Sequence, residues 1–243
     1  MAQFSPEIAN HWRATFSSGT VMEGEGGFTV AITSVLDDDS EAMVLKTAER
    51  KVMAAVTPAL AERLAVSARR DLSEPVFLRM LQEAGITLHD ADYIFYLAEG
   101  EKAALLREQP ASSVRLLTAD DAAVFAAFQS SASEEDLDAA YVELDHWLVF
   151  GAFEGDRLVC AASMYPWKEE SRLVDMGILT LATHRGKGHA RSVVRAISRH
   201  ALGQGYEPQY RCQLDNPASA ALAKAAGLTL FGEWQPVSPS SQG

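Results

Sequence analysis

A glycine-rich turn between a strand pattern and a helix pattern carries the clearest chemistry in this sequence. Residues 180–190 read TLATHRGKGHA, after an apolar stretch over residues 174–181 and before apolar residues at helical spacing. Glycine lets the backbone approach an anion closely, and the first N–H groups of a helix have no partners within it. The helix dipole adds positive potential, and Arg185 and Lys187 add formal charge. We therefore expect this turn to bind a nucleotide-like anion.

The glycine spacing separates the possible ligands. A Walker loop ends in Gly-Lys-Ser/Thr, whereas Gly188 is followed by His189. A dinucleotide loop needs a third glycine, but that position holds Arg191. What remains is Arg-x-x-Gly-x-Ala, formed by Arg185, Gly188 and Ala190.

A second segment lies downstream of the loop. Asn216 suits the N-cap of a helix, Pro217 suits its first position, and Gly227 suits a left-handed C-terminal cap. Ser219 follows the asparagine by three positions, and Leu228 follows the glycine. The order is therefore an asparagine, a small polar residue and an alanine-rich helix that ends in Gly-Leu.

The two segments together resemble the GNAT superfamily of acetyl-CoA-dependent N-acyltransferases, over residues 114–234. Leu228 stands where this family usually has phenylalanine, which is a tolerable apolar exchange. The whole chain resembles bacterial members that carry an N-terminal extension. The resemblance implies acetyl-CoA as cosubstrate and a primary amine, on a small molecule or a peptide, as acceptor.

The resemblance also implies where the cofactor lies. The strand before the loop pairs its backbone with the pantetheine arm, the loop holds the pyrophosphate, and the later helix lies beside the arm. Ala182 replaces a frequent proline, which leaves an N–H group without abolishing binding. For Asn216, a plain helix cap and a ligand contact are both open. The expected cofactor-binding residues are Leu179, Thr180, Leu181, Arg185, Gly186, Lys187, Gly188, His189, Ala190, Asn216 and Ser219.

Acetyl transfer needs a base for the amine and a proton for the leaving thiolate. Many relatives use a tyrosine in the final helix as the acid, but that position holds Ala223, so another group serves or the thiolate leaves unaided. Asp175, on the strand before the loop, is the first candidate base; its alternative is a purely structural role. Glu143 and His146, with Asp145, form a second candidate group at a helix-to-strand turn.

Aromatic residues and histidines near these positions have two interpretations each. Tyr165 and Trp167 end a strand beside the expected cleft, where they contact an acceptor or pack in the core. Tyr210 has the same ambiguity and is also a candidate proton donor. His184 and His189 flank the loop and are expected to face solvent or phosphate. With no Cys/His metal spacing, we expect no metal.

Composition limits the class of protein. The chain has 243 residues, 48% hydrophobic and 22% charged, as in globular proteins. A net charge of −12 argues against nonspecific nucleic-acid binding, and no apolar run suits a membrane span. Cys160 and Cys212 lie in predicted strands, which with the lack of a secretory signal favours the cytoplasm.

The patterning predicts an α/β protein of two domains, with a linker at residues 109–113. Residues 1–110 form a smaller α/β domain of unknown role, either a structural or dimerising appendage or a wall of the acceptor cleft. Residues 111–243 form a GNAT fold, a mixed sheet with helices on both faces, in the order β-α-α-β-β-β-α-β-α-β. In the first domain we predict strands at residues 28–33, 43–46, 52–56 and 93–97, and helices at residues 58–67 and 75–84.

Three functions compete at this stage. The leading hypothesis is an N-acetyltransferase, and the alternative is a noncatalytic acyl-CoA sensor, which would bind the cofactor without turnover. A nucleotide-binding oxidoreductase fails on the missing third glycine. The identity of the acceptor is not encoded in any motif, and a homodimer is left open.

Overall fold

The computed structural model describes residues 3–36, 40–167 and 171–237. The chain forms two compact units, which we describe separately. Unit 1 comprises residues 1–7, 95–211 and 216–229, and unit 2 comprises residues 8–94, 212–215 and 230–243. Within the described ranges, no helix is long and apolar enough to cross a bilayer.

Unit 1 contains the two segments that the sequence singled out. Its strands lie in the order β5-β10-β9-β8-β7-β6; β9 and β10 are parallel, whereas β6 to β9 pair antiparallel. The elements, some of which extend beyond the unit, are β5 (Asp92–Leu97), α4 (Glu99–Arg107), β6 (Val114–Leu116), α5 (Ala122–Gln129), α6 (Glu134–Ala140), β7 (Leu148–Glu154), β8 (Arg157–Pro166), β9 (Leu173–Thr180), α7 (His189–Gly203), β10 (Glu207–Gln213) and α8 (Pro217–Ala225).

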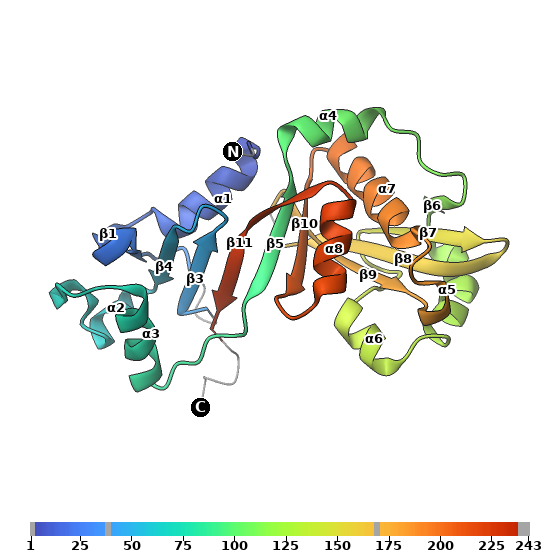
Figure 1. The fold of residues 1–243 in the computed structure, drawn as a ribbon. Coiled ribbons are helices and arrows are strands. Elements are labelled where there is room, and N and C mark those ends of the chain that lie inside the picture. The colour runs from blue at the N-terminus through green and yellow to red at the C-terminus, as the bar shows by residue number, and fades with distance from the viewer. Residues whose placement is uncertain (1–2, 37–39, 168–170, 238–243) are drawn as a thin grey trace. The chain divides into compact units, whose positions relative to one another are not determined.

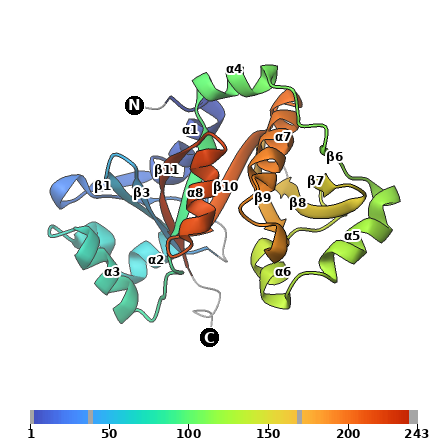
Figure 2. The same cartoon turned by 45° about the vertical axis from the view of Figure 1, so that its right-hand side comes forward.

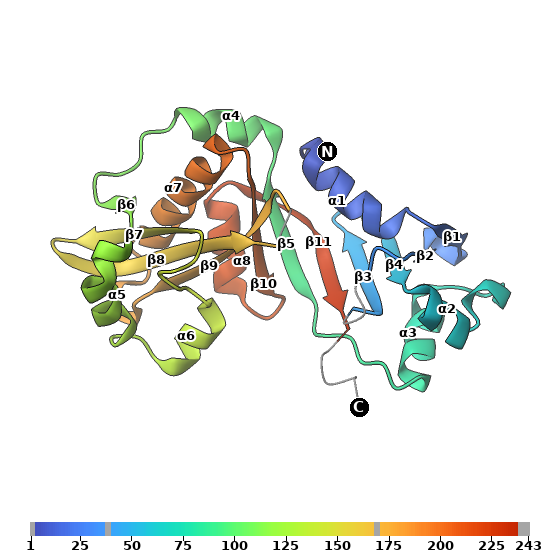
Figure 3. The same cartoon turned by 180° about the vertical axis from the view of Figure 1, so that it is seen from behind.

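Helices cover both faces of this sheet. Helix α7 packs on β6 to β9 from one face, and α5 and α6 pack on β8 and β9 from the other (Figures 1 and 3). Phe125 and Phe128 of α5 form a core with Leu179 and Leu181, while Val193 and Ile197 of α7 are fully buried. Burying an apolar face of each helix against the sheet is what holds these layers together.

Unit 2 is a second α/β body with its own core. Its strands lie in the order β1-β2-β4-β3-β11. The apolar residues of α2 and α3, such as Leu60 and Phe77, pack with Val44 of the sheet. Trp12 of α1 packs against Phe231 and Trp234 of β11. The elements are α1 (Pro6–Phe16), β1 (Thr20–Glu23), β2 (Thr29–Ile32), β3 (Ala42–Thr47), β4 (Val52–Val56), α2 (Pro58–Arg63), α3 (Glu74–Glu83) and β11 (Leu228–Pro236).

The predicted element order of residues 114–234 is confirmed, from β6 to β11, and so are the strands and helices predicted for residues 28–97. The sequence analysis missed α1, β1 and α4. The helix predicted at residues 58–67 ends earlier, at Arg63, because Ala65 adopts a left-handed φ of 52° and a short 3₁₀ turn follows. The predicted boundary between residues 110 and 111 stays a prediction; residues 95–110 lie in unit 1 with the later elements.

Candidate functional site

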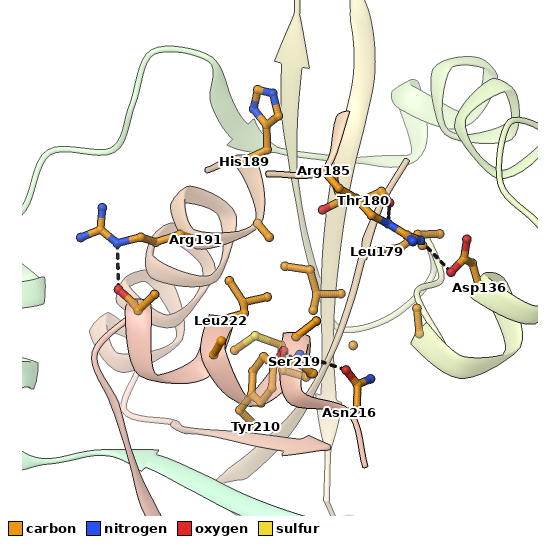
Figure 4. A pocket seen from close by; sticks show the side chains of 18 of the residues that line it. Asp136, Leu179, Thr180, Arg185, His189, Arg191, Tyr210, Asn216, Ser219 and Leu222 are labelled. Carbon is orange, nitrogen blue, oxygen red and sulfur yellow. Dashed lines mark hydrogen bonds and ion pairs between the residues drawn. The ribbon is translucent and has the colours of Figure 1, made fainter. Parts of the chain in front are cut away.

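A cavity of about 620 Å³ opens where β9 and β10 part (Figure 4). The two strands pair from Leu173 opposite Glu207 to Met176 opposite Tyr210, and their pairing stops there. The next four residues of β9, 177–180, line the cavity instead. The remaining lining comes from α6, the glycine-rich loop, the first turn of α7, the end of β10 and α8. The parted strands thus leave a groove whose floor includes strand backbone.

The glycine-rich loop closes one end of this cavity. Gly186 and Gly188 have φ values of 75° and 86°, which L side chains rarely adopt, although a Cβ at either position would meet no atom within 4 Å. Helix α7 begins directly afterwards at His189, with Gly188 at its N-cap. The first N–H groups of α7 therefore have no intrahelical acceptors at the loop, the arrangement that binds anions.

Most of the predicted cofactor residues lie together. The cavity lining includes Leu179, Thr180, Arg185, Gly186, Gly188, His189, Ala190, Asn216 and Ser219. The described lining does not include two of the predicted residues. Leu181 is buried and donates its N–H to Val159 of β8, and Lys187 turns its ammonium group to Glu154 of β7. For these two residues a contact with the cofactor stays a prediction.

Carboxylates already pair with the cationic side chains of the loop. Arg185 donates from Nε to the carbonyl of Thr180 (3.2 Å) and from Nη2 to Oδ1 of Asp136 on α6 (2.7 Å; Figure 4). Glu154 accepts from Lys187 at 3.0 Å and lies 2.8 Å from Nε2 of His189. Hydrogen bonds from Lys187 and then His189 hold the pKa of the Glu154 carboxyl below its usual range. An anionic ligand must therefore compete with two carboxylates for these cations.

His184 and His189 were expected to face solvent or phosphate. Both side chains are mostly buried, with 12% and 16% exposed. Each approaches Glu154, His184 at 3.6 Å and His189 at 2.8 Å. Both imidazoles thus lie near the Glu154 carboxylate, and a contact of either with phosphate stays a prediction.

Helix α8 and strand β10 together contribute a pair of hydroxyl groups to the cavity. The side chain of Asn216 accepts a hydrogen bond from the backbone N–H of Ser219, so it caps the helix, and it also lines the cavity (Figure 4). The hydroxyl groups of Ser219 and Tyr210 lie 2.7 Å apart. One turn after Ser219, Ala223 is fully buried. Tyr210 thus reaches from β10 toward the same face of α8 that carries Ala223.

The sequence analysis missed two charged residues that line this cavity. Asp136 was not singled out, and Arg191 was considered only because it occupies the position of the missing third glycine. Arg191 donates from Nε to the carbonyl of Ala225 (2.8 Å), and Arg195, one turn later, donates to the carbonyl of Ala226. These arginines satisfy carbonyls at the end of α8 and so tie it to α7 (Figure 2). Charged residues in the first turns of α6 and α7 are the sequence signal that could have found them.

Asp175, the first candidate base, lies in a buried polar network. Only 2% of Asp175 is exposed to solvent. Its Oδ2 accepts from Nε of Arg211 (2.9 Å) and from the hydroxyl of Tyr165 (3.3 Å), and its Oδ1 accepts from Nε2 of Gln209 (3.3 Å). The guanidinium of Arg211 also lies over the ring of Trp167, 4.7 Å from its centroid. These contacts favour the structural alternative for Asp175, and they place Tyr165 and Trp167 as its supports.

His146 lies near the same face of the sheet, in the loop between α6 and β7. Its Nδ1 is 2.8 Å from the hydroxyl of Ser163 on β8, and its ring contacts those of Tyr141 and Tyr165. Burial lowers the pKa of His146 below its usual value, against the smaller opposing effect of Asp145 and Glu143. The imidazole is therefore neutral at neutral pH and can accept a proton.

Glu143, the remaining candidate, is exposed and accepts a hydrogen bond from Gln129 (3.3 Å). An exposed side chain of this kind lacks the burial and the fixed partners that are typical of a catalytic proton acceptor. Among the described residues, no three His, Cys, Asp or Glu side chains gather where they could hold a metal ion.

Comparisons with known proteins agree with this geometry. Residues 90–236, more than half of the chain, match the family model described as GNAT acetyltransferase. A sequence comparison with curated proteins finds no match. Among solved structures, a GNAT-family acetyltransferase from Colwellia psychrerythraea is similar, with 15% identity, a TM-score of 0.50, and coverage of 89% of this chain and 80% of that one.

Two further solved structures resemble this chain. A GNAT-family protein from Novosphingobium aromaticivorans shares 12% identity at a TM-score of 0.49, over 95% of this chain and 93% of its own. The Salmonella typhimurium protein yncA, solved with its cofactor acetyl-CoA, shares 17% identity at a TM-score of 0.40, over 52% and 92%. The similarity to the Colwellia protein, at 15% identity and a TM-score of 0.50, supports the fold alone. The other two similarities have TM-scores below 0.5 and support no conclusion. The match to the family model decides the assignment: the chain belongs to the GNAT acetyltransferase family.

Proposed function

We propose that this protein is an N-acetyltransferase that transfers the acetyl group of acetyl-CoA to a primary amine on a small molecule or a peptide. The observation that carries the proposal is the parting of β9 and β10 after Met176, which ends at a glycine loop and a helix N-terminus. A long ligand with an amide-containing arm and a phosphate end suits a groove that offers strand backbone at one end and N–H groups at the other.

Two parts of the cavity would hold two different parts of acetyl-CoA. The backbone of Leu179 and Thr180 would pair with the pantetheine arm, and Asn216 and Ser219 would lie beside it. The loop from Arg185 to Ala190 would hold the diphosphate. Bound there, acetyl-CoA supplies the acetyl group as a thioester.

We assign the role of base to His146, because Asp175 is buried and accepts hydrogen bonds from Gln209, Arg211 and Tyr165, which hold it in place. In the reaction, the amine nitrogen bonds to the thioester carbon and gives up a proton to the unprotonated nitrogen of His146, directly or through water. The C–S bond breaks, and sulfur keeps the electron pair. The products are an N-acetylated amine and coenzyme A.

The thiolate needs a proton, and the hydroxyl pair of Tyr210 and Ser219 is the donor that lines the cavity. We propose that Tyr210 takes over, from β10, the role that relatives give to a tyrosine at the position of Ala223. Because a thiol is acidic, the pair contributes modestly to the rate.

We place this reaction in the cytoplasm, because Cys160 and Cys212 are both buried and neither forms a disulfide, as is usual in a reducing compartment. Unit 2 adds no recognised chemistry to the proposal, and the acceptor remains a primary amine of unspecified structure.

A release assay for the free thiol tests the proposed function. Purified protein is incubated with acetyl-CoA and, in turn, tyramine, spermidine, L-lysine and kanamycin as probe amines. We expect amine-dependent thiol release for at least one probe and thermal stabilisation by acetyl-CoA alone. Stabilisation without turnover on any amine would favour the noncatalytic sensor.

A matched pair of glycine variants tests where the cofactor binds. Gly188→Asp places a carboxylate where the diphosphate should lie. Gly205→Asp adds the same charge at the other end of α7, at a similar φ of 80° and also in open space. We expect only Gly188→Asp to abolish the stabilisation by acetyl-CoA. Equal stabilisation of both folded variants would refute the assignment of the loop.

A further inference from the structure

Ser163 is a buried hydroxyl one strand away from the cavity. It lies on β8 opposite Gly177 of β9, and the residue is 0% exposed. Residues directly opposite on paired strands point to the same face, so Ser163 faces the side on which Gly177 meets the end of α6. A Cβ at Gly177 would lie 2.1 Å from the carbonyl oxygen of Ala140, which shows how closely α6 approaches this strand. Ser163 therefore lies on β8 directly beside Gly177, a residue of β9 that lines the cavity.

Among the described residues, the side chain that shares a hydrogen bond with Ser163 is that of His146, whose Nδ1 lies 2.8 Å from the Ser163 hydroxyl oxygen. A neutral imidazole carries one proton, so this bond decides the chemistry of the other nitrogen. If Nδ1–H donates to Ser163, Nε2 has a free lone pair and can act as a base. If Ser163 donates to Nδ1, the proton is on Nε2 and the ring cannot accept another there.

The other neighbours of His146 do not fix the tautomer. The rings of Tyr141 and Tyr165 lie 5.0 and 4.9 Å from the imidazole centroid, so they hold its plane by packing. The hydroxyl of Tyr165 donates to Asp175 instead. Asp145 and Glu143, from the same loop, act on His146 through charge alone. Which nitrogen of His146 carries the proton thus depends on the direction of its hydrogen bond with Ser163.

We propose that Ser163 is a positioning residue: it accepts the Nδ1 proton of His146 and so keeps Nε2 unprotonated for the amine. This inference rests on the proposed acetyl transfer, in which the amine proton moves to Nε2 as the N–C bond forms and the C–S bond breaks. Ser163 itself neither gains nor loses a proton overall. Its function is to select one of the two neutral forms of the ring before the acceptor arrives.

Nitrogen NMR of the histidine ring tests the proposal without any ligand. In ¹⁵N-histidine-labelled protein at pH 8, His146 is assigned by its loss in His146→Gln. We expect a protonated Nδ1 and an unprotonated Nε2 in the wild type, and a shift toward protonated Nε2 in Ser163→Ala. A proton on Nε2 in the wild type, or the same tautomer in both proteins, would overturn the proposal.

Kinetics with the probe amine that is turned over fastest add a second readout. Ser163→Ala should lower kcat/KM for the amine about 2- to 13-fold, as expected for one hydrogen bond. It should cause no further loss in a His146→Gln background, because both changes remove the same function. Full additivity of the two losses would overturn the link between the residues.

Ser198→Ala is the matched control. Ser198 on α7 is 1% exposed, and its hydroxyl has no hydrogen-bond partner among the described residues. We expect wild-type kinetics from it. Stabilisation of every variant by acetyl-CoA reports on the proposed function separately: its absence in the wild type would count against acetyl-CoA binding, whereas the NMR result would still decide the role of Ser163.

Discussion

Arg185 of the glycine-rich loop is bonded to Asp136 of α6, with 2.7 Å between Nη2 and Oδ1. The same guanidinium donates from Nε to the carbonyl of Thr180, on the strand that would pair with the pantetheine arm. Both partners of Arg185 line the cavity. The side chain expected to bind a diphosphate thus already has partners on α6 and β9, and a bound diphosphate would compete with them.

Asp136→Asn should therefore raise the affinity for acetyl-CoA. The ion pair is partly exposed, with 52% and 35% of the two side chains accessible, so its loss is worth about 0.2–1 kcal/mol. That corresponds to an affinity gain of up to about five-fold by isothermal titration calorimetry. Asp138→Asn removes the same charge from an exposed position of α6 and is the control. Equal gains in both variants would point to overall charge rather than to the pair with Arg185.

Glu154→Gln tests the other carboxylate of the loop. It frees Lys187 and His189 for an anion, so acetyl-CoA should bind more tightly at low salt, and the gain should shrink as ionic strength rises. Because Glu154 and Asp136 hold different cations, the two gains should add within about 0.5 kcal/mol. Titrations of the single and double variants at two salt concentrations measure this. A weaker complex would mean that Glu154 orders the loop for binding.

The sequence predicted the parts of this site that depend on local backbone physics. Glycines before a helix, the Asn216 cap and the strand leading to the loop all follow from short-range rules, and their positions are confirmed. Short-range rules do not predict which residues from distant segments of the chain contact each other. Asp136 lies 49 positions from Arg185 in the sequence, and Arg211 lies 36 from Asp175. No periodicity encodes such pairs, and this is why the sequence left both a catalytic and a structural role open for Asp175.

The proposed role of His146 predicts the pH profile. Burial lowers the pKa of His146 below its ordinary value of 6.5. The neutral, basic form is therefore lost only as the pH falls below 6.5, so kcat/KM for the amine should decline on an acidic limb below that value. The same shift means that the fold binds fewer protons than the unfolded chain there, so stability should also decrease as the pH falls through this window. His146→Gln should remove this contribution to both slopes; an unchanged acidic limb in that variant would exclude His146 as the base.

The position of α4 predicts the result of truncation. Within unit 1, Lys102 of α4 is 2.6 Å from Glu207 at the start of β10, and Glu108, just beyond the helix, pairs with Arg195 of α7. A chain that begins at Ala111 loses these partners, whereas one that begins at Phe95 keeps them. We expect the shorter chain to melt at a lower temperature and to bind acetyl-CoA less well. Equal melting temperatures would support the boundary predicted between residues 110 and 111.

Asp175→Asn separates the structural role of this carboxylate from a catalytic one. The change removes the carboxylate charge that pairs with the partly buried guanidinium of Arg211 and weakens bonds from Gln209 and Tyr165. We expect a loss of about 2–3 kcal/mol in the free energy of unfolding. Turnover per folded molecule should stay within about two-fold, since a base would contribute at least about 100-fold. Chemical denaturation and the thiol-release assay measure the two quantities.

The double variant Asp175→Asn/Arg211→Met provides the control for this prediction. Removing the guanidinium together with the carboxylate takes away both charges of this ion pair, so the double variant should be more stable than Asp175→Asn alone. Recovery of stability in the double variant, with turnover unaffected in the single one, would establish Asp175 as the anchor of Arg211. The opposite pattern, wild-type stability with turnover reduced about 100-fold or more in Asp175→Asn, would restore Asp175 as the base. In that case Ser163 and His146 would lose their proposed roles together, because the amine needs only one proton acceptor.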